Sequence, residues 1–110
     1  MSDLADKLAK FKANAEEQLT KAGETNIDDA LLSKLVDNLK LVIDNRDARS
    51  VAGSDPSEME TVRTNFVVKK LGINDKDRGT AAVTAVAEKM SGSHNKNRAA
   101  FYYLVQKALT

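Results

Sequence analysis

Residues 27–43 read IDDALLSKLVDNLKLVI, and this is the most apolar segment of the chain. Its large aliphatic side chains recur at every fourth position, at Ile27, Leu31, Leu35, Leu39 and Ile43. That spacing places them on one face of an α-helix. Because asparagine is a good N-cap residue, we expect a helix from about Asn26 to about Asp44, and its long apolar face predicts that it is the central helix of the core.

Four further helices are predicted outside this segment. The first covers residues 3–22, with Ser2 as its N-cap and Gly23 as its terminator. The others cover residues 55–71, 75–90 and 95–109, and residues 45–54 form a connection with room for one short helical turn. The clearest start is Asp55-Pro56-Ser57-Glu58, where Asp55 caps the helix and Glu58 is spaced to reach back to it. Gly79, near the start of the helix over 75–90, indicates a frayed first turn.

The composition fits one small all-α domain. The chain has 110 residues, with Pro 1, Gly 5 and no useful alternation of strand-forming and polar residues. We therefore expect a compact bundle of four to five helices over residues 1–110, with residues 26–110 as the core bundle. The docking of residues 1–23 stays open, because alanines dilute the apolar stripe there. This helix can pack on its own core, pair with another chain, or project.

The sequence also predicts the cellular compartment of the protein. No apolar run approaches the roughly 18 residues of a membrane-spanning helix, and the polar N-terminus is unlike a signal peptide. The chain contains 0 Cys, which fits a reducing compartment. We therefore expect a cytoplasmic protein that does not bind membranes.

Reactive groups are scarce. His94 is the single histidine, and without cysteine it cannot build a usual zinc site. The segment 75–79 has the wrong ligand spacing for a calcium loop, and no serine lies in a nucleophile motif. The glycines do not form a phosphate-binding loop. We therefore expect no catalytic residue, no metal site and no cofactor.

The basic residues suggest the candidate binding surface. Residues 1–45 have 6 Lys/Arg and 9 Asp/Glu, whereas residues 46–110 have 11 and 7, so the second part has a net charge of +4. If the last three helices share a face, they form a binding surface from Arg63, Lys69, Lys70, Lys96, Arg98 and Tyr103. The structural alternative is that Arg63 or Arg98 binds carbonyl groups of the 46–54 connection. Tyr102 and Tyr103 are about 100° apart on a helix, so only one can point into the core centre.

Several short motifs carry a resemblance that covers about two thirds of the chain, from about Leu39 onward. They are Asn45-Arg46-Asp47, Val51-Ala52-Gly53-Ser54-Asp55 with Glu58, Val62 and Arg63, Lys69-Lys70-Leu71-Gly72 with Asp75 and Asp77, Lys89-Met90, Asn95-Lys96-Asn97-Arg98 and Phe101-Tyr102-Tyr103-Leu104. In these motifs the chain resembles a family of small bacterial proteins, domain of unknown function 2853. The resemblance implies an all-helical fold and a bacterial cytoplasmic setting, but no reaction, ligand or partner. The helix up to Gly23 is the part that we do not expect in this family.

The scarcity of catalytic, metal-binding and cofactor-binding motifs favours a non-enzymatic protein-interaction or regulatory module. Its partner is another protein or a second copy of the chain, through the apolar stripe of the first helix or the ridge near Arg98 and Tyr103. The alternative function is nucleic-acid binding by the basic C-terminal half. Against that alternative, the net charge of the whole chain is only +1, and no helix-turn-helix pattern is present.

Overall fold

The computed structural model describes residues 3–45, 49–53, 55–93 and 95–110. The expected N-cap Ser2, the single histidine His94 and the Arg46-Asp47 motif lie outside these residues. In the described residues the chain forms five α-helices, two short helical segments and one two-stranded ribbon. The prediction of a compact all-α bundle is confirmed, and the Cα radius of gyration of 13.1 Å equals the value of about 13 Å expected for a globular domain of this length.

Helix α2, Asp29–Asn38, forms within the segment that opened the sequence analysis, but it is shorter than predicted. Asp28 is the N-cap, and its carboxylate accepts a hydrogen bond from the Leu31 N–H at 3.1 Å. The predicted cap, Asn26, has φ 52°, a left-handed conformation that a turn residue adopts and an N-cap residue does not. After Leu39 the chain continues as a 3₁₀ segment, η1, over Lys40–Val42.

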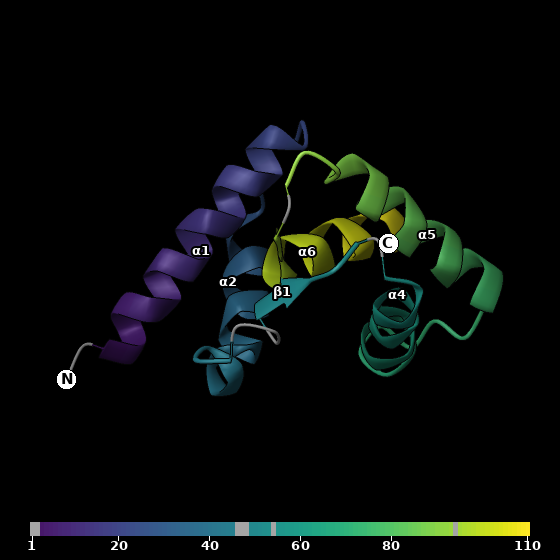
Figure 1. The fold of residues 1–110 in the computed structure, drawn as a ribbon, viewed down its shortest axis with the longest axis horizontal. Helices are drawn as coiled ribbons and strands as arrows, with labels where there is room; N and C mark the ends of the chain where they lie inside the picture. The colour runs from purple at the N-terminus through teal and green to yellow at the C-terminus, as the bar shows by residue number, and fades with distance from the viewer. Residues whose placement is uncertain (1–2, 46–48, 54, 94) are drawn as a thin grey trace.

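Helix α1, Asp3–Lys21, packs on its own chain against α2 and α6, which answers the question that the sequence left open (Figure 1). It buries Phe11, Ala15 and Leu19. Gly23 ends it as predicted, with φ 93° and with the Glu24 N–H bonded to the Leu19 carbonyl at 2.9 Å. Only glycine adopts this backbone conformation readily, so the helix stops there.

The predicted helix over 55–71 is divided into α4, Pro56–Val62, and a π-helical segment, η2, Arg63–Val68. The Leu71 N–H donates to the Phe66 carbonyl, five residues earlier, at 3.0 Å. The wider turn advances the helix face by one residue, so Phe66 and Val67 are both buried. Asp55 caps α4 as predicted, but through the Ser57 N–H at 2.9 Å, and Glu58 points to a different partner described below.

Helix α5, Lys76–Lys89, begins after Asp75, whose carboxylate accepts from the Arg78 N–H at 3.1 Å. Gly79 was predicted to mark a frayed first turn, and this prediction is wrong. It is buried, and a Cβ atom there would lie 3.2 Å from side-chain atoms of both Arg63 and Val67. The glycine therefore allows α5 to approach η2 closely.

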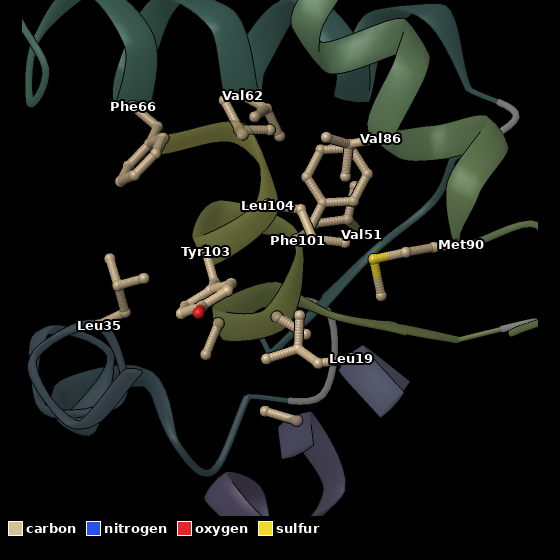
Figure 2. Close-up of a cluster of buried hydrophobic side chains, with 14 of the residues drawn as sticks. Leu19, Leu35, Val51, Val62, Phe66, Val86, Met90, Phe101, Tyr103 and Leu104 are labelled. Atoms are coloured by element: carbon tan, nitrogen blue, oxygen red, sulfur yellow. The ribbon is translucent and has the colours of Figure 1, made fainter. Parts of the chain in front are cut away.

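The last helix, α6, Arg98–Leu109, is the central element, in place of the predicted α2. It lies between α1 and α2 on one side and α4 and α5 on the other (Figure 1). Side chains from the surrounding helices converge on its Phe101, Tyr103 and Leu104 (Figure 2). Because α6 is enclosed on several sides, it buries residues around most of its circumference.

The sequence did not predict the two-stranded antiparallel ribbon. Strand β1, Ser50–Val51, pairs with β2, Lys96–Asn97, with Ser50 opposite Asn97. Each strand has two residues, too few to show the alternating pattern from which strands are predicted. The ribbon fixes the 49–53 connection against the start of α6. No helix in the described part of the chain is long and apolar enough to span a membrane.

Candidate functional site

The six residues predicted as a binding surface do not form one. Lys69 and Lys70 are exposed, and Arg63 is half-buried, with its Nε 3.0 Å from the Glu60 carboxylate. The other three residues, Lys96, Arg98 and Tyr103, are buried, so they cannot contribute to an exposed surface. Sequence position groups these residues, whereas the fold directs half of them inward.

Arg98 has a structural role, in agreement with the alternative that this arginine binds a carbonyl group of the 46–54 connection. Its guanidinium donates to the Ser50 carbonyl at 2.7 Å, to the Glu58 carboxylate at 2.5 Å and to the Tyr102 hydroxyl at 3.1 Å. Burial lowers the pKa of Arg98, but the adjacent Tyr102 and Glu58 oxygens outweigh this effect and raise the pKa above its ordinary value. The charge is therefore retained, and it joins α4, β1 and α6.

Asn97 and Gln18 form a second buried polar contact, between α1 and the start of α6. The Asn97 amide nitrogen donates to the Phe11 carbonyl and to the Asn14 side chain, both at 3.0 Å. Its oxygen accepts from the Ala100 N–H at 3.1 Å, which makes it the N-cap of α6. Gln18 accepts from the Asn97 N–H at 2.7 Å. These buried groups are satisfied within the chain, which indicates a structural role.

Tyr103 is the inward member of the tyrosine pair. It is 1% exposed, and its hydroxyl accepts from the Asp28 N–H at 2.8 Å. Tyr102 is half-buried and stacks on Phe66, with ring centroids 4.1 Å apart and planes 9° from parallel. The predicted binding aromatic, Tyr103, is therefore a core residue, and Tyr102 is the tyrosine that reaches the surface.

The candidate site is a groove of about 490 Å³ between α2 and η2, which we call the α2–η2 groove. Leu35 from α2 and Phe66 from η2 lie on its two sides, as Figure 2 shows for their side chains. The stacked Tyr102 extends the floor from α6. The remaining apolar lining is Leu31, Leu39 and Leu71, all of them only partly buried. Exposed apolar surface collected in one depression is typical of an interaction site.

The rim of the groove is polar and cationic. Lys34 from α2 and Lys70 beyond η2 line it, together with the amides Asn38, Asn65 and Gln106. Both lysines are exposed, and neither has an ion-pair partner within 4.0 Å among the described residues. In contrast to Arg98, they have donor atoms available for a ligand.

The groove contains Lys34, Lys70 and Tyr102 as its titratable side chains. Its lining includes no carboxylate, histidine or cysteine. In the residues that the structure describes, no group of three or more His, Cys, Asp or Glu side chains is placed to hold a metal ion. The arrangement suits binding through apolar contact and cationic hydrogen bonds.

Residues 11–110 match the model of a family described as Protein of unknown function (DUF2853). The chain belongs to this family. The match confirms the resemblance found in the sequence motifs and corrects its extent, because it includes most of α1, which we had not expected in DUF2853. The match specifies no reaction or ligand, and no curated protein matches the chain.

Most of the groove was not predicted from the sequence, because Lys70 is the one residue of its lining that belonged to the predicted binding surface. One signal was available in the apolar stripe of residues 27–43. Leu31, Leu32, Leu35, Val36 and Leu39 cover more of the helix circumference than one neighbouring helix can bury. The excess apolar side chains of α2 are the ones that line the groove.

Proposed function

We propose that the protein is a non-enzymatic, cytoplasmic interaction module whose α2–η2 groove binds an amphipathic helix of a partner protein. The partner helix would place apolar side chains on the groove floor and carboxylates beside Lys34 and Lys70. The observation that carries this proposal is the combination of partly buried leucines with two exposed lysines that have no ion-pair partner among the described residues.

Physical chemistry supports a helical partner. A groove between two helical elements is a common receptor for an amphipathic helix, which is held by apolar anchors at helical spacing. The half-buried side chains of Leu31, Leu39 and Leu71 provide apolar area that such anchors would remove from water. The lysines would supply selectivity, because an acidic helix is attracted and a basic helix is repelled.

Nucleic-acid binding, the alternative drawn from the basic C-terminal half, has less support. Lys96 and Arg98 are buried, and Arg63 pairs with Glu60. Electrostatic attraction to phosphates depends on accessible cations gathered on one face. The exposed Lys69 and Lys70 are too few to make such a face by themselves.

A designed peptide tests the interaction module. The probe is a helical peptide of about 15 residues, four turns, with leucines at helical spacing on one face and glutamates on its flanks. We expect saturable binding by fluorescence anisotropy, with amide shifts in NMR spectra at Leu31, Leu39 and Asn65. The double variant Lys34→Glu/Lys70→Glu should weaken binding at least about tenfold, because it replaces attraction with repulsion.

Matched controls make the result specific. Lys21→Glu/Lys76→Glu changes two exposed lysines outside the groove and should leave the affinity unchanged. A peptide with lysines in place of the glutamates should not bind. Shifts on another face, or equal binding of both peptides, would contradict the proposal. Self-association that Leu39→Glu abolishes would also contradict it, because a second copy would then occupy the groove.

A further inference from the structure

Lys96 is a buried lysine whose side chain occupies space beside a glycine. The residue is 7% exposed, and its side chain lies directly over Gly53. A Cβ atom at position 53 would be 2.7 Å from Lys96 Cε and 3.1 Å from Nζ. The absence of a side chain at Gly53 therefore opens the space that the lysine occupies, and β2 fixes the backbone from which it extends.

The ammonium group of Lys96 is only partly satisfied. An ammonium has three donors, and the Ser93 carbonyl accepts one at 2.9 Å. Within the described residues no carboxylate lies within 4.0 Å of Lys96 Nζ. Arg98, two residues later, is also buried but has Glu58 as its counter-ion. A buried cation without a counter-ion is costly, and an external anion would remove that cost.

An open cavity of about 470 Å³ is lined by Lys96 together with residues of α4 and α5. The exposed hydroxyl-bearing residues Thr84 and Ser91 line it, and Met59 and Ala87 supply apolar wall. Glu88 lines the same cavity and contributes one negative charge. The cavity therefore offers one cation, two hydroxyl groups, an apolar surface and one carboxylate.

We propose that this cavity binds a small monocarboxylate, with its carboxylate against the Lys96 ammonium and its short apolar tail against Met59 and Ala87. Thr84 and Ser91 would donate further hydrogen bonds to the carboxylate. The lining selects the ligand class, because one ammonium with two hydroxyl groups matches a single carboxylate, and Met59 and Ala87 match a short apolar tail. The proposal is independent of the α2–η2 groove, since the two sites share no lining residue.

The test is an NMR titration of the full chain with sodium butyrate, beside inorganic phosphate and sodium chloride at equal ionic strength. We expect saturable shifts for the amides of Thr84 and Ser91 and for the Lys96 side chain with butyrate alone. Lys96→Met should weaken butyrate binding at least about tenfold, the usual effect of losing a hydrogen bond to a charged group. Lys69→Met, a change at an exposed lysine outside the cavity, should have no effect.

Two other variants keep the test valid if Lys96→Met disturbs folding. Thr84→Val and Ser91→Ala change exposed residues and should weaken butyrate binding severalfold while leaving the circular dichroism spectrum unchanged. Butyrate shifts that survive in Lys96→Met, or are absent in the wild-type chain, would overturn the proposal. Phosphate binding as tight as butyrate binding would overturn the assignment of the ligand as a monocarboxylate.

Discussion

The start of α6 and the rim of the α2–η2 groove have similar side chains in different situations. Both regions contain asparagine and a long basic side chain. At the start of α6, Asn97 and Arg98 are buried, and their polar atoms contact the backbone or side chains of α1, α4 and β1. At the groove, Asn65 and Lys70 are exposed beside partly buried leucines. Residue type alone therefore does not show whether a basic side chain is buried among internal partners or exposed.

The largest expected difference between the two regions is in the free energy of unfolding that is lost when their basic side chains are replaced. Arg98→Met should lower the free energy of unfolding by about 3 kcal/mol, because it leaves Glu58 without its partner and removes the bond to the Ser50 carbonyl. Lys70→Met should change it by no more than about 0.5 kcal/mol, as is usual for an exposed side chain. Urea titration monitored by circular dichroism measures both, and equal values would show that Arg98 does not join these elements.

The asparagines give a smaller but similar contrast. Asn97→Ala removes the N-cap of α6 and leaves the Phe11 carbonyl without its donor, so we expect a loss of about 2 kcal/mol. Asn65→Ala, the matched change at the groove, should be nearly neutral because Asn65 is exposed. If thermal unfolding of the Asn97 variant coincides with that of the wild type, α1 is held without the buried polar contact.

The smallest expected effect concerns the ion pair between the half-buried Arg63 and the exposed Glu60. The adjacent Arg63 guanidinium lowers the pKa of the Glu60 carboxyl below its ordinary value. This pair therefore stabilises the fold at neutral pH, and its contribution disappears as the pH falls through the lowered pKa. In Arg63→Met we expect the pKa of Glu60 to rise toward its ordinary value, measured by NMR titration of the side-chain carbon. No change would show that the pair is not formed in solution.

Helix positions were predicted well because they depend on local chemistry. Asp55 caps its helix as predicted, and Asp75 caps the helix that was predicted over 75–90, since a short acidic side chain before a helix meets its free N–H groups. Gly23 and Gly72 have the positive φ angles that end a helix. Two of the errors arose where distant segments meet. Gly79 allows close packing on η2, and Glu58 pairs with Arg98 instead of its own cap.

The binding surface was predicted poorly for the same reason. The direction of Lys96, Arg98 and Tyr103 depends on β1, α4 and the residue before α2, which are remote in sequence. The α2–η2 groove depends on a π-helical turn and on the place of α6, and neither has a local sequence signature. Only the excess of leucines on α2 indicated a surface that the domain itself does not cover.

The sequence alone determined the all-helical class, the positions of most helix ends and the membership of DUF2853, because caps, breakers and apolar periodicity act over a few residues. The tertiary structure decided that α6 is the central helix, that α1 docks on its own chain, and which cations are buried. Those features depend on contacts between segments far apart in the chain, where burial and counter-charges determine the environment of each side chain.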